Sequence, residues 1–191
     1  TAATITNAPS TPPPVLNGPS PVCLNSTNNI YSTDAGKIDY EWTVVGGTIT
    51  SGGTATDNTV TVTWNTTGTQ SVSVNYADAG TGCKSANPTI KNVVVHPLPA
   101  AAISGTAAVC QNASGIVVTF TGSGGTVPYT FTFNINGGSS QTISTSVWSS
   151  SVTYFVPTGT PGTYTYTLES VSDNTGCSQT QSGSAVVTVT A

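Results

Sequence analysis

The segment LNGPSPVCLN at residues 16–25 recurs 87 residues later as ISGTAAVCQN at residues 103–112. Each copy is followed by a second shared feature, DAGTGC ending at Cys83 and DNTGC ending at Cys177. Each half of the chain therefore begins with the pattern G-x-x-x-V-C-x-N and nears its end with a Gly-Cys turn. A repeat of this length has the size of a whole domain and not of a solenoid unit.

The boundary between the two halves is predicted at VHPLP, residues 95–99, where a strand-like run ends. Two prolines stiffen the chain there and cannot donate hydrogen bonds to a sheet. We therefore expect one domain over residues 14–97 and a second over residues 98–191. Residues 1–13 are expected to be a linker or the end of a preceding module. Residues 1–7 have neither the charged start nor the apolar core of a signal peptide, so we expect an internal fragment.

Apolar residues alternate with polar ones along many short segments, which is the period of a half-buried β-strand. The residues predicted to face the core of the first domain are Tyr40, Trp42, Val44, Val60, Val62, Trp64, Val72, Val74 and Tyr76. Those of the second domain are Ile116, Val118, Phe120, Tyr129, Phe131, Phe133, Ile135, Val152, Tyr154, Val156, Tyr164, Tyr166, Leu168, Ala185, Val187 and Val189. Turn signals separate these segments, and no helical period is present. The predicted fold class is all-β, with two tandem antiparallel β-sandwich domains of about seven strands each.

The composition excludes several classes of function. Only 5% of the residues are charged, and three Lys, no Arg and seven acidic residues give a net charge of -4. Binding to nucleic acid or to an anionic membrane surface needs clustered Lys and Arg, which this chain lacks. No run of about 20 apolar residues is present, so no membrane insertion is expected. A hydrophobic content of 36% in alternating runs argues against a disordered chain.

The four cysteines occur in the two repeats, at spacings that zinc sites do not use. Four cysteines allow three pairings, and the repeat favours Cys23 with Cys83 and Cys110 with Cys177. Each such bridge would close a long loop and stabilise its domain by about 4 kcal/mol. This interpretation places the chain in an oxidising, extracellular compartment. The alternative is a cytosolic protein with free buried thiols.

Two sets of motifs resemble known repeat families. In the first domain YEWTVVGGTI at residues 40–49, VTVTW at residues 60–64 and the turn at Cys83 resemble the PKD-like repeats of large bacterial surface proteins. The W-D-F-G-D-G type strand and turn of standard PKD repeats is absent. In the second domain GGTVPYTF at residues 124–131, GTYTY at residues 162–166 and the turn at Cys177 resemble the SprB-type repeats of gliding-motility adhesins.

The resemblance covers residues from about 14 to 191 and implies an immunoglobulin-like sandwich. It also implies many repeats in a very long protein, exported to the bacterial cell surface by the type IX route of gliding bacteria. No catalytic residues belong to these repeats, so the resemblance assigns none. Repeats of this kind also serve as spacers in secreted hydrolases, so module type alone does not determine function.

Few residues are candidates for catalysis. His96 is the only histidine and lies at the predicted junction, without the second histidine or the pocket that a metal site or a catalytic triad needs. Asp39 and Glu41 share a strand face, but the neighbouring aromatic residues are predicted to face the core. Their carboxylates are therefore expected to be solvated instead of facing one cleft as in a glycosidase. We expect no enzymatic activity, no catalytic residues and no cofactor.

Calcium is the one ligand for which the loops offer candidates. Asp78 and Asp173 recur ahead of the two Gly-Cys turns, where backbone carbonyl oxygens would complete an oxygen shell. No D-x-D-x-D-G loop is present. An aspartate that caps a turn explains the recurrence as well.

Trp148 differs from the other two tryptophans because it lies in a Ser-rich stretch, residues 144–151, with Tyr154 close behind. These two aromatic residues are candidates to stack on a sugar ring or on an adjoining module. The alternative is a tryptophan that folds over the edge of the sandwich.

Together these patterns predict a structural and interaction segment of a long, secreted cell-surface adhesin, acting as a spacer or filament. Expected partners are neighbouring modules of the same chain, surface polysaccharide and other cell-surface proteins. The alternative function is a carbohydrate-binding or spacer module attached to a secreted hydrolase.

Overall fold

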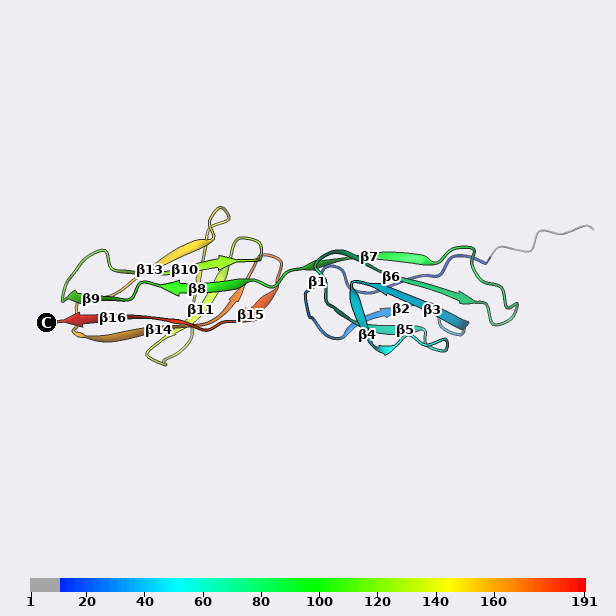
Figure 1. Ribbon diagram of the computed structural model, residues 1–191, viewed down its shortest axis with the longest axis horizontal. Coiled ribbons are helices and arrows are strands. Elements are labelled where there is room, and N and C mark those ends of the chain that lie inside the picture. The colour runs from blue at the N-terminus through cyan, green and yellow to red at the C-terminus, as the bar shows by residue number, and fades with distance from the viewer. Residues whose placement is uncertain (1–10) are drawn as a thin grey trace, which may run out of the picture. The chain divides into compact units, whose positions relative to one another are not determined.

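The computed structural model describes residues 11–191, and every regular element in that part of the chain is a β-strand. The structure divides into two compact units, the first ending at His96 and the second beginning at Pro97. The division falls one residue before the boundary expected from the sequence. Most of the expected N-terminal linker, residues 1–10, lies outside the described residues. Figure 1 shows each unit as two layers of strands.

The first unit contains two sheets. One has the strand order β1-β7-β6-β3, with β1 at Val22–Cys23, β7 at Thr89–His96, β6 at Gly68–Ala77 and β3 at Ile38–Val45. The other has the order β2-β5-β4, with β2 at Asn29–Ser32, β5 at Thr59–Trp64 and β4 at Gly47–Gly52.

The core between these sheets is centred on Trp64 and Tyr31, both with no exposed surface. The Tyr31 hydroxyl accepts a hydrogen bond of 3.1 Å from the Trp64 indole nitrogen and donates one of 2.9 Å to the Pro19 carbonyl. Both polar atoms of this aromatic pair therefore have partners inside the core, as burial requires.

The second unit has a larger sheet of order β12-β11-β14-β16-β9, with β15 paired to β14. Their bounds are Gln141–Ser144 for β12, Thr130–Ile135 for β11, Gly162–Ser172 for β14, Ser184–Thr190 for β16, Ala107–Cys110 for β9 and Ser178–Thr180 for β15. The facing sheet has the order β13-β10-β8, with β13 at Ser151–Phe155, β10 at Val117–Ser123 and β8 at Ala100–Ser104. Phe120 packs against Phe131 and Phe133 between the sheets, with ring centroids 5.6 and 4.8 Å apart.

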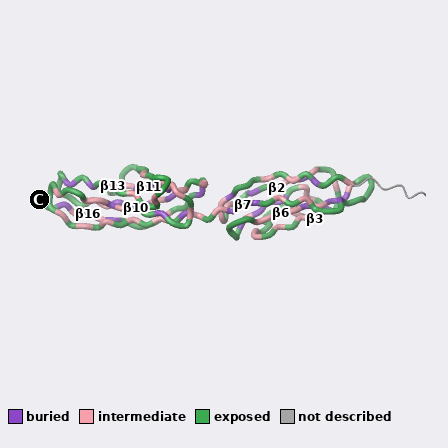
Figure 2. Tube along the Cα trace, turned by 90° about the horizontal axis from the view of Figure 1, so that it is seen from above, coloured by how far each residue is buried: buried purple, intermediate pink, exposed green. Residues whose placement is uncertain are grey.

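Burial alternates along most of the strands as the sequence predicts, and Figure 2 shows this alternation as a change of colour along strands such as β6 and β16. In β5, for example, Val60, Val62 and Trp64 are buried, whereas the residues between them are only partly buried. The prediction of an all-β fold built from sandwiches is confirmed.

Each unit departs from a purely antiparallel sandwich at one strand pair. β1 runs parallel to β7, with Cys23 opposite His96, and β9 runs parallel to β16, with Cys110 opposite Thr190. The first strand of the first unit, β1, and the second strand of the second unit, β9, therefore lie beside the last strand of their unit and point the same way. This pairing connects residues more than 70 positions apart, so no local pattern of the sequence encodes it.

The recurring G-x-x-x-V-C-x-N motif is the segment that moves the chain from one sheet to the other. In the second unit β8 pairs with β10, Gly105 follows with a φ of 118°, and β9 then joins the opposite sheet. A Cβ atom at Gly105 would lie 2.5 Å from the Val117 carbonyl oxygen, which excludes other residues without a backbone shift.

The last residue of the motif has the same structural role in both units. Asn25 and Asn112 have φ values of 59° and 64°, in the left-handed region that asparagine tolerates. They follow strands β1 and β9 in turns where the next amide, that of Ser26 or Ala113, donates 3.1 Å hydrogen bonds to the Cys23 or Cys110 carbonyl. The motif is therefore a folding signature, and its recurrence needs no ligand to explain it.

Candidate functional site

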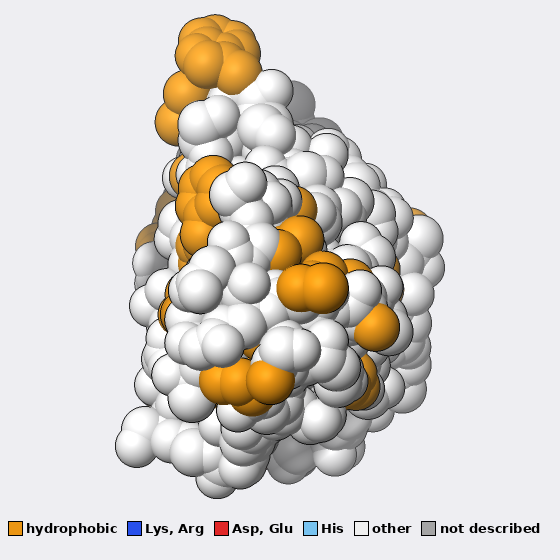
Figure 3. Space-filling model, turned by 90° about the vertical axis from the view of Figure 1, so that its left-hand side faces the viewer, with side chains coloured by type: hydrophobic (Ala, Val, Ile, Leu, Met, Phe, Trp, Pro, Cys, Tyr) orange, Lys and Arg blue, Asp and Glu red, His pale blue; other side chains and the backbone are white. Residues whose placement is uncertain are grey.

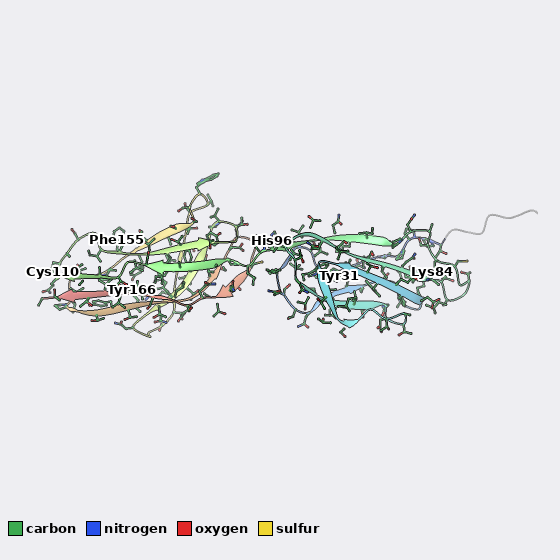
Figure 4. The ribbon with its side chains drawn as sticks, viewed as in Figure 1. Tyr31, Lys84, His96, Cys110, Phe155 and Tyr166 are labelled. Carbon is green, nitrogen blue, oxygen red and sulfur yellow. The ribbon has the colours of Figure 1, made fainter. Side chains whose placement is uncertain are left out.

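The two cysteines of each unit lie at opposite ends of the sandwich. In the first unit Cys23 is opposite His96, the last residue of β7, whereas Cys83 precedes the start of the same strand. Eight residues of extended strand separate these ends by roughly 25 Å. Figure 4 shows Lys84, the neighbour of Cys83, and His96 at opposite ends of the unit. A disulfide needs Cα atoms within about 7 Å, so the two residues cannot be bridged.

The second unit repeats this arrangement. Cys110 is opposite Thr190 near the end of β16, and Cys177 follows the far end of the 11-residue strand β14. Each unit therefore has two ends that we name. The exit end is the end at which the last strand of the unit finishes. The turn end is the opposite end, which carries the Gly-Cys turn. Figure 4 places Cys110 at the exit end of the second unit.

The predicted pairing of Cys23 with Cys83 and of Cys110 with Cys177 is wrong. Cys83 and Cys110 are free and exposed, and Cys23 and Cys177 are disulfide-bonded. The cause is the direction of the first strand. The segment runs along β7 in the direction of that strand, from Pro14, whose carbonyl accepts the Thr89 hydroxyl, to Cys23 opposite His96, and so carries Cys23 to the end away from Cys83. The predicted clasp within each domain therefore does not form.

Asp78 and Asp173, the calcium candidates, both cap the turn that precedes a cysteine. One carboxylate oxygen of Asp78 accepts the amides of Gly80 and Thr81 at 3.1 and 3.2 Å, and the other accepts the Lys37 ammonium at 2.7 Å. The Lys37 contact is the main reason that the pKa of Asp78 is lowered, and the two backbone amides add to it.

Asp173 makes the equivalent contacts in the second unit without a lysine. Its Oδ1 accepts the amides of Thr175 and Cys177 at 3.0 and 3.2 Å, and its Oδ2 accepts the Thr126 amide at 2.8 Å. Partial burial raises the pKa of Asp173, but the hydrogen bonds from Thr175, Thr126 and Cys177 outweigh it, so the pKa is lowered overall.

The turn-capping alternative therefore accounts for both aspartates. Their oxygens already accept N–H donors, which an oxygen shell for calcium would have to displace. Within residues 11–191, no three side chains of His, Cys, Asp or Glu gather in a way that would hold a metal ion.

The Asp39 and Glu41 carboxylates have different neighbours. Asp39 has a φ of 52° at an irregularity in the β3–β6 pairing, and it lines a cavity of ≈ 410 Å³ with Lys37, Ala55 and others. Glu41 accepts the Lys84 ammonium at 2.6 Å on the surface. The pair of carboxylates facing one cleft that glycosidase chemistry needs is not formed by these two residues.

His96 ends β7, and its carbonyl oxygen accepts the Leu24 amide at 2.8 Å. The residue thus closes the parallel pair at the exit end of the first unit through its backbone. This is the junction position that the sequence predicted for it.

Trp148 is 93% exposed, in the loop between β12 and β13, and its neighbour Val147 is 56% exposed. The alternative in which this tryptophan folds over the sandwich edge is therefore wrong. Figure 3, which faces the end of the second unit where the C-terminus lies, shows separate hydrophobic groups among backbone and uncharged side chains, with no Lys, Arg, Asp or Glu in view.

Tyr154, the second candidate ligand-contacting aromatic residue, faces inward. Its ring centroid lies 5.4 Å from that of Phe133 and 5.7 Å from that of Tyr166. The outward aromatic residue of β13 is Phe155, which is 71% exposed and is labelled in Figure 4. The strand alternation already placed Tyr154 on the core side, and that signal identifies Phe155 as its outward neighbour.

Comparison with known proteins supports the fold. Residues 8–92 match the family model of the PKD-like domain. One similar solved structure is a 282-residue C-terminal fragment of intimin in complex with the intimin-binding domain of the translocated intimin receptor. It is 16% identical to this chain, with a TM-score of 0.52. The alignment covers 92% of this chain and 63% of the intimin fragment. The fibronectin(III)-like modules of CbhA from Clostridium thermocellum are 16% identical with a TM-score of 0.43, covering 92% and 94%. The comparison with curated proteins gives no match. The first unit is thus similar to a PKD-like domain, and the intimin likeness agrees with a tandem of β-sandwiches.

Proposed function

We propose that this chain is a structural and interaction segment of a long, secreted protein at the bacterial cell surface, where its units act as spacers in a tandem array. The observation that carries the proposal is the parallel pairing, in both units, of a strand near the start of the unit with its last strand. In such a pair the preceding chain leaves at one end and the following chain at the other. Tension along the array then loads the hydrogen bonds of the pair in shear.

Loading in shear makes all the bonds of a strand pair resist together instead of opening one at a time. In the second unit four residues of β9 pair with β16, and the Gln111 amide adds a bond of 2.6 Å to the Thr190 carbonyl. In the first unit only two residues of β1 pair with β7, with the Leu24 amide adding one bond to His96. The second unit is thus built to resist the larger force.

One further observation supports an extracellular position. Disulfide-bonded cysteines are typical of oxidising compartments. Among residues 11–191, no helix is long and apolar enough to cross a membrane. The proposal includes export by the type IX route and a role in gliding-motility adhesion, for which the SprB-type motifs of the second unit are the support. It assigns no enzymatic activity to the chain.

Force spectroscopy on single chains tests the mechanical proposal. The chain is held at its two ends in a reducing buffer, so that no disulfide bears the load. Two unfolding events are expected, each adding about 30 nm of contour length, with the first unit unfolding at the lower force. Gradual extension without resolved force peaks would refute the spacer proposal. Labelling of intact producing cells with an antibody to the chain tests its location.

The exposed Trp148 loop favours a second function, a carbohydrate-binding module attached to a secreted hydrolase. An indole with 93% exposure offers a flat apolar face to a sugar ring. The intimin fragment binds a protein receptor domain, so a cell-surface protein is the other class of partner that the proposal admits.

A further inference from the structure

The four cysteines fall into two structurally equivalent pairs. Cys23 and Cys110 both end a strand that runs parallel to the last strand of their unit, and each accepts a 3.1 Å hydrogen bond from the amide three residues later. Cys83 and Cys177 both close a turn in which the capping aspartate donates its own amide to the cysteine carbonyl, at 2.9 and 3.0 Å. The repeat in the sequence thus corresponds to a repeat in position.

The bonding states divide each equivalent pair. Of the exit-end cysteines, Cys23 is disulfide-bonded and Cys110 is free. Of the turn-end cysteines, Cys177 is disulfide-bonded and Cys83 is free. Both free thiols are exposed. The chain therefore has one free exit-end thiol and one free turn-end thiol, and each occupies a position whose counterpart is bonded.

We infer that Cys110 and Cys83 form disulfides with adjoining modules of the same kind, an exit-end cysteine always pairing with a turn-end cysteine. The partner of Cys110 is a turn like Asp78–Cys83, and the partner of Cys83 is a strand end like β9. This rule applies to a tandem array and so rests on the function proposed above. It replaces a clasp within each module by a covalent link from each module to the next.

The geometry supports this rule against a bridge inside one module. The ends that carry the two kinds of cysteine are about 25 Å apart or more within a unit, which no disulfide spans. A bond between an exit end and a turn end is heterologous, so it repeats along an array without closing. A short linker holds the next module near the exit end at millimolar effective concentration, which favours the bond without a large interface.

The chemistry needs an oxidant, which we take to be a disulfide-bearing compound or oxidoreductase of the extracellular space. One thiolate attacks the oxidant's disulfide, forms a mixed disulfide and releases one thiol of the oxidant. The second cysteine thiolate then attacks the cysteine sulfur of the mixed disulfide and releases the second thiol. Two cysteine thiols are thereby oxidised by two electrons, and one disulfide of the oxidant is reduced to two thiols.

A chain that carries two copies of this sequence in tandem tests the inference directly. After incubation in oxidised and reduced glutathione, peptide mapping without reduction should link Cys110 of the first copy to Cys83 of the second. The product should stay monomeric. The inference is wrong if Cys110 of the first copy and Cys83 of the second copy remain open to alkylation while Cys23 and Cys177 of both copies resist it.

The pairing rule has its own test in separate chains. A Cys83→Ser variant and a size-tagged Cys110→Ser variant are mixed at equal concentration in the same redox buffer. We expect several-fold more heterodimer than the two homodimers combined, whereas random collision gives equal amounts. An excess of homodimers would overturn the rule. Neither outcome bears on the force measurement of the reduced chain, so the failure of this inference and that of the proposed function are distinguishable.

Discussion

Cys23 lies in register with His96, because the short strand β1 runs parallel to the last strand of its unit. That single relationship decides the chemistry of the cysteines. It carries Cys23 away from Cys83, which precedes the same last strand, and Cys110 has the same relation to Cys177 in the second unit. It also places the first and last strands in shear when the chain is pulled.

Alkylation of the native chain without a reducing agent should modify Cys83 and Cys110 and leave Cys23 and Cys177 unmodified. The first two are free and exposed, and the other two are disulfide-bonded. Mass spectrometry of the tryptic or chymotryptic peptides locates the modified residues. After reduction and unfolding all four should react. A native link from Cys23 to Cys83 would contradict the parallel pairing of β1 with β7.

The sequence predicted what is local in the fold and missed what is not. The period of two along β5 and β14 is written in neighbouring residues, so the buried sets around Trp64 and Tyr166 follow from it. The direction of β1 depends on a partner strand more than 70 residues away. Because the sequence does not reveal that β1 runs parallel to this strand, the predicted cysteine pairing was wrong.

The candidate site divides in the same way. The recurrence of Asp78 and Asp173 ahead of a Gly-Cys turn indicated a turn cap, which is a contact within a few residues, and the structure contains it. The exposure of Trp148 depends on how far its loop stands from the sheets, which composition does not encode. Asp39 and Glu41 were placed on one face by spacing alone, and an irregularity in β3 gives them different neighbours.

Replacement of Gly105 by Ala should destabilise the second unit by about 1–3 kcal/mol. Its φ of 118° is unfavourable for any residue with a side chain, and the new Cβ would lie 2.5 Å from the Val117 carbonyl oxygen. Urea denaturation followed by tryptophan and tyrosine fluorescence measures the change. The control is Gly159→Ala, where the nearest atom to the new Cβ is 4.0 Å away. Equal stability of the two variants would show that the crossing at Gly105 is not strained.

Two buried tyrosines should respond oppositely to loss of the hydroxyl group. Tyr31→Phe leaves the Trp64 indole N–H and the Pro19 carbonyl without their partner, and should destabilise the first unit by about 1–3 kcal/mol. The Tyr166 hydroxyl is buried and has no hydrogen-bond partner within residues 11–191, so Tyr166→Phe should be neutral or stabilising. Thermal unfolding of both variants tests the pair. A loss of stability in Tyr166→Phe would point to a bound water at that hydroxyl.

The stability of the second unit should fall in acid because of Asp173. Its pKa in the folded state is lowered from the ordinary value of 3.8, so its contribution is fully present above that value and is lost as the pH falls through the folded-state pKa. Asp173→Asn should therefore be less stable than the native chain at pH 7, with the difference shrinking below pH 3.8. Urea denaturation across this range measures it, with the exposed Asp39→Asn as control. A difference that is constant with pH would mean that the charge of Asp173 contributes nothing.

Removal of the Trp148 side chain should leave folding and mechanical strength unchanged if the units are spacers. The indole is 93% exposed and contributes little to the core, so Trp148→Ala should unfold at the same urea concentration and the same force as the native chain. Phe155→Ala, also exposed but on β13 itself, is the matched control for loss of a surface aromatic residue. Glycan-array and polysaccharide pull-down assays with the three proteins then separate the two proposed functions. Tight binding that is lost in Trp148→Ala and kept in Phe155→Ala would identify the loop as a sugar-binding site and would replace the spacer proposal by the binding-module alternative.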